Sequence, residues 1–364
     1  MKLLHFVADG RPGGATTHVL QLLAGSEYRD QLGLLTQSDS YLAEQAAKMG
    51  VPVFEGNFFR SRLDTNAVRQ AESAAASFQP ELIHCHGGRA AFFQSWTKNR
   101  TPWIYTVHGF HFSHKSFLTR KLALVAERRS IKIASSVIFV SEYDRQLAVR
   151  ERLLPASKTY HVIHNGVPKP IPSLVEPSGE IGWIGRVEYQ KHPELFLEMM
   201  EQLPGRRAVL AGGGSLDDVI DREIQRRNLG DRVRRVGSLN HAACINLLAG
   251  LDLLVMTSRW EGLPLTPLEA MHLQVPVVST AVGGLTEIIE HRRTGMLSTH
   301  ESAQELAGSI QELEENPELR RTIVQSAAHL VATDFSEESM FRKTEAAYQA
   351  IPRLQRKPEL STAS

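Results

Sequence analysis

The chain has 364 residues, of which 41 are Lys or Arg and 40 are Asp or Glu, so its formal net charge is +1. This balance argues against a general nucleic-acid-binding protein. Cys85 and Cys244 are the two cysteines, which argues against a disulfide framework and fits a reducing cytoplasm. No apolar run approaches the roughly 18 residues that a membrane-spanning helix needs. At roughly 150 residues per domain, the length predicts two domains.

The first half of the chain alternates short apolar runs with segments of helical periodicity. This alternation predicts a parallel, doubly wound α/β sheet. We expect helices over residues 62–78 and 117–134. The expected strands cover residues 3–8, 32–36, 82–86, 103–107, 137–140 and 159–163.

A proline-rich run separates the two halves. Pro168, Pro170 and Pro172 permit neither a helix nor a central strand, so we place a linker at residues 168–178. The α/β alternation then resumes, with strands expected at 181–184, 208–211, 232–236, 253–256 and 275–279.

These boundaries predict two Rossmann-like lobes that face each other across a cleft. The carboxyl ends of the strands face such a cleft, and the lobes can close about the proline linker when a ligand binds. The expected parts are an N-terminal domain (1–167), a C-terminal domain (179–335), a last helix that returns to the N-terminal domain (336–352) and a polar tail (353–364).

Glycine turns follow several of the expected strands. Gly13 and Gly14 open a helix and let the backbone approach a phosphate, although a plain tight turn is equally consistent. Gly185, Arg186 and Lys191 suit a diphosphate, which Arg grips in bidentate fashion and Lys as a point charge. The alternative is a pair of solvated surface cations.

Two further glycine turns have the same position relative to a strand. In the turn at 212–214, Ser215 as a helix N-cap is at least as consistent as ligand contact. The turn at 283–284 opens a short helix and can offer amides to a ligand. Several such turns on one edge of one cleft together favour a phosphate-bearing ligand.

Two carboxylates frame the loop and helix start that follow the expected strand 253–256. Residues 266–269 form a capping box with Thr266 as N-cap, so Glu269 has a structural explanation. Glu261 has none, because it precedes Gly262 in a loop at the cleft edge. A carboxylate there accepts hydrogen bonds from sugar hydroxyls. We therefore expect Glu261 to be the cleaner test of function.

Two groups of histidines raise the question of a metal. In the strand 82–86, Cys85 points away from its two histidine neighbours, which leaves at best a two-ligand site. His108, His111 and His114 are spaced three residues apart. We favour His108 as a hydrogen-bonding residue at a strand end and expect no metal.

The stretch 115–132 is strongly basic and carries apolar side chains among its cations. A basic amphipathic helix can rest on an anionic membrane, and a solvated helix face is the alternative. The cations are Lys115, Arg120, Lys121, Arg128, Arg129 and Lys132, against the single acid Glu127.

Taken together, these motifs resemble glycosyltransferase family 4, a group of retaining, metal-independent enzymes with the two-lobed GT-B fold. The resemblance is carried by the stretch 260–271 with its two glutamates, the Arg186 and Lys191 pair, and the turn at 282–287. The Gly-Gly loop at 13–14 and the segments Thr-Val-His-Gly at 106–109 and His-Asn-Gly-Val at 164–167 match in the same order.

The resemblance implies a role for each motif. Glu269 would bind the ribose hydroxyls and Glu261 would approach the donor sugar, while Arg186 and Lys191 would neutralise the diphosphate. Pro264 stands where many relatives have glycine, so one amide donor is lost there. The predicted catalytic residues are His108, Arg186, Lys191 and Glu261, and the predicted donor-binding residues are Gly13, Gly14, Gly185, Gly262, Leu263, Pro264, Leu265 and Glu269.

By this resemblance we expect a cytoplasmic enzyme, with or without peripheral contact to the inner face of the plasma membrane. It would transfer a hexosyl or N-acetylhexosaminyl group from a nucleotide sugar, with UDP favoured, and would need no cofactor. The expected acceptor is a saccharide or lipid-linked saccharide of bacterial surface-polysaccharide synthesis. The alternatives are a sugar-nucleotide epimerase or phosphorylase on the same fold, and a non-catalytic sugar-nucleotide-binding protein.

Overall fold

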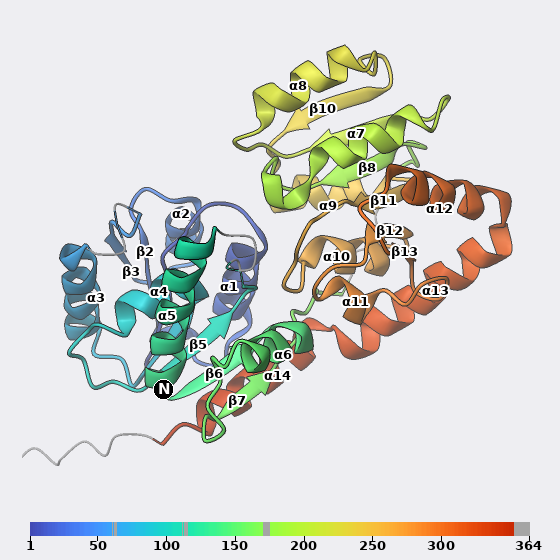
Figure 1. The fold of residues 1–364 in the computed structure, drawn as a ribbon. Coiled ribbons are helices and arrows are strands. Elements are labelled where there is room, and N and C mark those ends of the chain that lie inside the picture. The colour runs from blue at the N-terminus through green and yellow to red at the C-terminus, as the bar shows by residue number, and fades with distance from the viewer. Residues whose placement is uncertain (60, 62–63, 111, 113–115, 170–174, 353–364) are drawn as a thin grey trace, which may run out of the picture.

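The computed structural model describes residues 1–352 except residues 60, 62–63, 111, 113–115 and 170–174. It has two lobes, each built on a parallel β-sheet with helices on both faces (Figure 1). The predicted pair of doubly wound sheets is confirmed. No helix in the described part of the chain is both long and apolar enough to cross a bilayer.

The N-terminal sheet has seven strands in the order β3-β2-β1-β4-β5-β6-β7. Its central strands are buried along their whole length and largely apolar, as expected where helices cover both faces of a parallel sheet. The strands are β1 (Leu3–Val7), β2 (Leu32–Gln37), β3 (Val53–Gly56), β4 (Leu82–His86), β5 (Trp103–Val107), β6 (Ser136–Phe139) and β7 (Tyr160–Val162).

Six α-helices connect these strands. Three of them begin at a side-chain cap, from Ser40, Asp64 and Ser141, which accepts a hydrogen bond from a first-turn amide. The helices are α1 (Gly14–Gly25), α2 (Tyr41–Lys48), α3 (Thr65–Phe78), α4 (Gly87–Gln94), α5 (Phe117–Ile133) and α6 (Glu142–Arg150).

The C-terminal sheet has six strands in the order β10-β9-β8-β11-β12-β13. Strand β11 pairs with β8 on one side and β12 on the other, so the residues that follow it lie at the middle of the sheet edge. The strands are β8 (Ile181–Ile184), β9 (Ala208–Ala211), β10 (Val233–Gly237), β11 (Leu253–Met256), β12 (Val277–Thr280) and β13 (Met296–Ser298).

The helices of the second half cover this sheet and then return to the first lobe. They are α7 (Pro193–Glu201), α8 (Asp217–Arg226), α9 (His241–Ala249), α10 (Leu265–His272), α11 (Leu285–Ile288), α12 (Ala303–Glu315), α13 (Pro317–Asp334) and α14 (Glu337–Gln349).

The sequence missed two strands, β3 and β13. Both lie at the edge of their sheets. β3 has only one buried residue in four, and β13 has three residues, so neither has the continuous apolar run by which the central strands were predicted.

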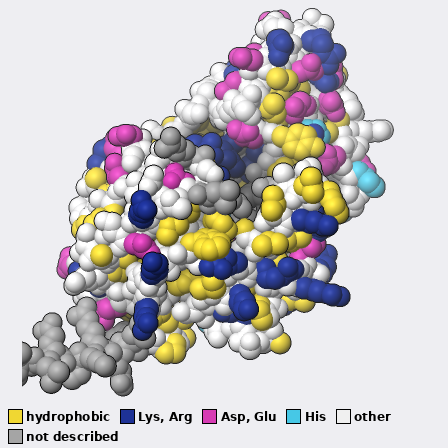
Figure 2. Space-filling model, turned by 60° about the vertical axis from the view of Figure 1, so that its left-hand side comes forward, with side chains coloured by type: hydrophobic (Ala, Val, Ile, Leu, Met, Phe, Trp, Pro, Cys, Tyr) yellow, Lys and Arg dark blue, Asp and Glu magenta, His cyan; other side chains and the backbone are white. Residues whose placement is uncertain are grey.

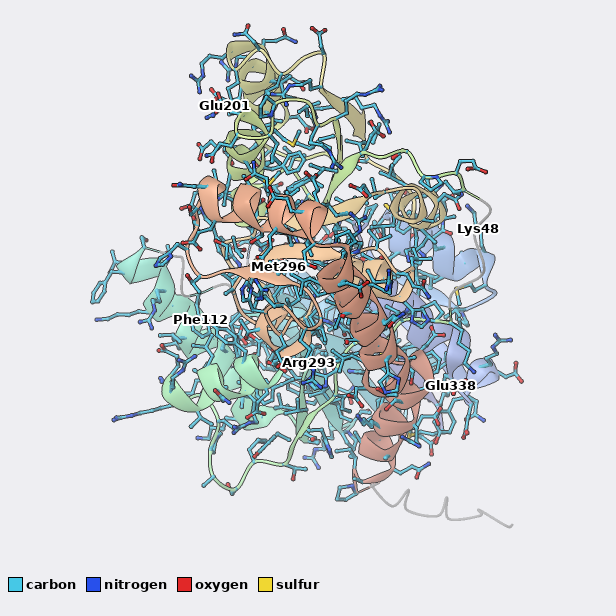
Figure 3. The ribbon with its side chains drawn as sticks, turned by 90° about the vertical axis from the view of Figure 1, so that its right-hand side faces the viewer. Lys48, Phe112, Glu201, Arg293, Met296 and Glu338 are labelled. Atoms are coloured by element: carbon cyan, nitrogen blue, oxygen red, sulfur yellow. The ribbon has the colours of Figure 1, made fainter. Side chains whose placement is uncertain are left out.

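The chain crosses between the lobes twice, and the two crossings lie side by side. Val167 pairs with Ser336 in an isolated parallel bridge, and the Val167 amide donates to the Phe335 carbonyl at 2.9 Å. From there α14 packs against α1 in the N-terminal lobe. Figure 3 shows α13 and α14 from the side, with Glu338 at the start of α14. Residues 170–174 of the predicted linker and the tail 353–364 lie outside the described residues.

Candidate active site

The loop after β11 places a buried carboxylate beside a lysine. Lys191 Nζ lies 2.5 Å from Glu261 Oε1, and the Ser258 hydroxyl donates to the same oxygen at 2.5 Å. The side chain of Glu261 is only 6% exposed. Glu261 therefore has a structural partner that its local sequence did not reveal, so the expectation of a purely functional role is wrong.

Glu269 lies on α10, but it does not close a capping box. The helix begins at Leu265 after Pro264, which is extended, and no side chain caps this end. Thr266 therefore lies inside the helix, so the predicted cap is wrong. Glu269 Oε1 instead contacts His241 Nε2 at 2.8 Å, and this hydrogen bond raises the pKa of His241.

The start of α10 presents backbone groups near Glu261. Leu263 and Leu265 have buried side chains, and Pro264 lies between them without an amide hydrogen. The Leu263 carbonyl accepts from Asn165 Nδ2 of the other lobe at 2.6 Å. Because no side chain caps α10, its first amides are available to an acceptor such as a sugar oxygen.

Arg186 is exposed at the end of β8 and faces the N-terminal lobe. Its guanidinium donates a hydrogen bond to Gln190 Oε1 at 3.3 Å. Burial opposes the ionisation of Asp9, but hydrogen bonds from Arg11 and the nearby charge of Arg186 outweigh it and lower the pKa of Asp9. Arg186 is therefore a cation at the mouth of the cleft. Figure 2 shows a hollow between the lobes with basic side chains in its wall.

The glycine turns differ in whether packing requires glycine there. A Cβ on Gly212 would lie 1.7 Å from the Gly185 carbonyl oxygen, and one on Gly284 would lie 1.9 Å from that of Gly262, so close backbone packing explains both glycines. A Cβ on Gly13 or Gly14 would meet nothing within 4 Å. Packing therefore does not require glycine at 13 and 14, where the backbone borders open space.

The turn at 212–214 leads to α8, whose N-cap is Leu216 with no side-chain hydrogen bond. Ser215 as N-cap is thus wrong. Its hydroxyl donates instead to Glu188 Oε2 at 2.7 Å, which ties this turn to the one at 185–191.

The lobes touch directly at two of the predicted site residues. A Cβ on Gly262 would lie 2.8 Å from the His108 carbonyl oxygen and 3.1 Å from Gly109 Cα, so only glycine permits this approach. Nearby, Glu287 accepts from the Glu142 and Tyr143 amides at 3.0 and 2.7 Å. The segment after β5 and the loop after β11 therefore form one contiguous region.

His108 belongs to a buried cluster of imidazoles. His86 Nδ1 lies 3.2 Å from His108 Nε2, and His86 Nε2 lies 3.0 Å from His5 Nδ1. His84 is bonded to the Thr106 and Tyr348 hydroxyls at 2.6 and 2.7 Å. His111 and His114 lie outside the described residues.

The sequence did not predict that His5 and His18 join this cluster. The register of β1 and β4 places His5 beside His84, and α1 places His18 over His86 and His108. Burial lowers the pKa of His5 to about 3 and that of His18 to about 4, and both imidazoles are neutral at pH 7. A single histidine in each segment carries no local signal, because these contacts depend on strand pairing.

Comparison with known proteins identifies both halves of the chain. A family model described as Glycosyltransferase Family 4 matches residues 12–169, and one described as Glycosyl transferases group 1 matches residues 171–330. The chain is 26% identical to the alpha-D-kanosaminyltransferase of Streptomyces kanamyceticus over 70% of its length and 72% of that protein. It is 24% identical to the glycogen synthase of Mycobacterium tuberculosis over 78% and 72%.

Solved structures show the same two-lobed arrangement. The structure of Anabaena HepE in complex with UDP and glucose superposes with a TM-score of 0.85 at 23% identity, covering 96% of this chain and all of that chain (100%). Sucrose-phosphate synthase from Thermosynechococcus elongatus gives a TM-score of 0.79 at 20% identity, covering 96% and 98%. These likenesses establish the GT-B fold. With the two family models spanning residues 12–330, they show that the chain belongs to the family 4 type of glycosyltransferases.

Proposed function

We propose that this glycosyltransferase moves a hexosyl or N-acetylhexosaminyl group from a UDP-sugar to an acceptor hydroxyl, with retained anomeric configuration. The observation that carries the proposal is the contact of His108 and Gly109 with Gly262, beside the Lys191 and Glu261 pair. It joins residues of both lobes into one site. HepE, which has the same fold, binds UDP-glucose.

Arg186 and Lys191 supply positive charge for the diphosphate leaving group. Negative charge grows on that group as the glycosidic bond breaks, so fixed cations stabilise the transition state more than the ground state. Lys191 is held in place by Glu261, whereas Arg186 is exposed and can turn toward a ligand. The proposal needs no metal or other cofactor, because these two side chains supply the charge.

Glu269 and the start of α10 provide hydrogen-bonding groups for the donor. The Glu269 carboxylate accepts from the ribose hydroxyls, and its bond to His241 fixes its orientation. The first amides of α10, with Leu265, are oriented toward sugar oxygens. Gly13 and Gly14 border open space and admit phosphates close to the backbone at the start of α1.

For the acceptor, we propose a saccharide or lipid-linked saccharide of surface-polysaccharide synthesis, reached at the inner face of the plasma membrane. Helix α5 exposes Leu118, Leu122 and Val125, which share one helix face at i, i+4 and i+7. Lys121 and Lys132 are exposed on the same helix. Figure 2 shows hydrophobic and basic side chains side by side on this lobe. Such a surface suits an anionic bilayer, at roughly 1 kcal/mol per cation near it.

Not every cation of the basic stretch faces solvent. Arg120 is paired with Glu151 at 2.7 Å, and Arg129 stacks on Trp96 with its guanidinium carbon 3.7 Å from the ring centroid. Lys115 lies outside the described residues. The apolar side chains of α5 therefore contribute much of the proposed membrane contact.

Vesicle binding tests the membrane contact. The wild-type chain should cosediment with vesicles of anionic phospholipid at low salt, and Leu118→Glu with Leu122→Glu should abolish cosedimentation. Met49→Glu is the matched control, because it adds a charge at an exposed apolar residue that follows α2 as its C-cap. Equal cosedimentation of the Leu118→Glu/Leu122→Glu variant and the wild type would contradict docking through α5.

A donor panel tests the function itself. UDP- and GDP-hexoses and N-acetylhexosamines are incubated with the protein and saccharide acceptors, and products are followed by release of nucleoside diphosphate and by NMR of the new linkage. We expect release of UDP together with a product whose new glycosidic linkage has the same anomeric configuration as the donor sugar. An epimeric donor would indicate an epimerase, a sugar phosphate a phosphorylase, and binding without turnover a non-catalytic protein. Any of these three outcomes would contradict the proposal.

A further inference from the structure

Three imidazoles near the carboxyl ends of the central strands of the N-terminal sheet lie close enough to share a metal ion. They come from α1 (His18), the end of β4 (His86) and the residue after β5 (His108). One ring nitrogen of each lies within 4.8 Å of one from each of the others. His18 and His86 are 3% and 4% exposed, and His108 is half-buried.

The spacing suits tetrahedral zinc. Two imidazole nitrogens bound at about 2.0–2.1 Å in tetrahedral geometry lie roughly 3.3 Å apart. His86 Nδ1 and His108 Nε2 are already 3.2 Å apart. His18 faces both rings edge-on, with centroid distances of 5.8 Å to His86 and 5.0 Å to His108. A small rotation of side chains would complete the set.

The hydrogen bonds around the triad favour metal ligation. His18 Nδ1 is buried and has no hydrogen-bond partner among the described residues. His86 Nε2 lies 3.0 Å from His5 Nδ1, so a proton on His86 Nε2 can be donated to His5 and leaves the Nδ1 lone pair for a metal. Histidine ligands of zinc commonly donate their second nitrogen in this way.

A second triad, His5, His84 and His86, also has its nitrogens within 4.8 Å but is less suited. Both nitrogens of His84 are already bonded, to Thr106 and to Tyr348. All three rings are also fully enclosed, with no residue of the triad reaching the surface. Only the triad with His108 combines an unpartnered ring nitrogen, on His18, with a residue that is partly exposed, and a metal site needs both a free lone pair and an entry path.

We propose that His18, His86 and His108 form a binding site for Zn²⁺ or a similar divalent transition metal, with the fourth position open to water. The inference goes beyond the proposed transfer reaction, which uses no metal. Occupation would hold His108 against α1 and so would inhibit any reaction that needs this side chain free.

Metal titration of the tag-free chain tests the site without any substrate. Zn²⁺ is titrated at pH 7 in competition with a chromophoric chelator, and Co²⁺ is followed by its visible absorption. We expect one ion per chain. His18→Gln and His108→Gln should each weaken binding at least 10–100-fold, the loss that even an outer-shell substitution causes. Circular dichroism of each variant establishes that the fold is intact.

Two further variants locate the ion. His300→Gln is the matched control: His300 is an exposed histidine outside the triad, so this variant should bind Zn²⁺ as the wild type does. His5→Gln removes only the outer-shell partner of His86 and should weaken binding less than His18→Gln or His108→Gln does. Stoichiometric binding that survives both His18→Gln and His108→Gln, or no binding of either ion by the wild type, would overturn the proposal.

Discussion

At the scale of single residues, Glu261 is a buried carboxylate whose charge is balanced by Lys191. The side chain of Glu261 is 6% exposed and that of Lys191 is 16% exposed, so water solvates neither charge well and each depends on the other for compensation. Ser258 adds a second bond to the same oxygen. Loss of either partner would leave an uncompensated charge, which typically costs about 3–5 kcal/mol of stability.

We therefore predict that Glu261→Gln lowers both stability and turnover. The unfolding free energy should fall by on the order of 3 kcal/mol, because Lys191 keeps its charge without a partner. The double variant Lys191→Met with Glu261→Gln should recover most of that stability and none of the turnover. Chemical denaturation and UDP-release assays measure the two quantities.

Recovery of turnover in the double variant would contradict a functional role for this pair. Stability unchanged in Glu261→Gln would contradict the buried ion pair. Because this variant mixes folding and function, the exposed Arg186 is the better residue for a purely functional test.

At the scale of elements, the start of α6 holds the segment after β5 in place. Asp144 accepts from the Phe110 amide at 3.2 Å and from the Ser141 hydroxyl at 2.8 Å. Burial, together with the charge of Glu287, raises the pKa of Asp144 to about 7 in spite of these two hydrogen bonds. The carboxyl of Asp144 thus changes charge near neutral pH while it is bonded to Phe110, which follows His108 by two residues in the chain.

A carboxyl with a raised pKa stabilises the fold below its unfolded pKa of 3.8 and loses that contribution as the pH rises through 7. We predict that wild-type stability falls between pH 5 and pH 8 by on the order of 2–3 kcal/mol from this group. Asp144→Asn keeps the acceptor for Phe110 but cannot ionise, so its profile should be flatter. Guanidinium unfolding at each pH measures the difference.

The control for this profile is Asp231→Asn, because Asp231 is exposed. Its pH profile should follow the wild type. Parallel profiles for Asp144→Asn and the wild type would contradict a buried, titrating Asp144.

Central strands such as β9 and β11 were predictable because each is a short apolar run. The start of α10 was not, because the extended Pro264 lets the helix begin one residue before the expected cap. The partners of Glu261 and His86 could not be predicted either, since Lys191 and His5 lie 70 and 81 residues away in the sequence. Long-range partners follow from strand order, which local sequence does not specify.

At the scale of the whole molecule, the site exists only where the two lobes meet. Asn165 bonds the Leu263 carbonyl, Glu287 bonds the start of α6, and the backbone of Gly262 lies against that of Gly109. The two chain crossings at Val167 and Ser336 hold the lobes on the same side of this contact. Arg186 faces Asp9 across it, where the leaving group is proposed to lie.

The most direct test of the proposed reaction is the turnover of Arg186→Ala with the UDP-sugar that the wild type uses. The side chain is exposed, so stability should not change, while turnover should fall by on the order of 10²–10³, the scale for one lost transition-state contact. Arg293→Ala, which removes an exposed arginine that pairs with Glu290 (Figure 3 labels Arg293), should keep wild-type turnover. Wild-type turnover in a folded Arg186→Ala variant would contradict sugar transfer at this site.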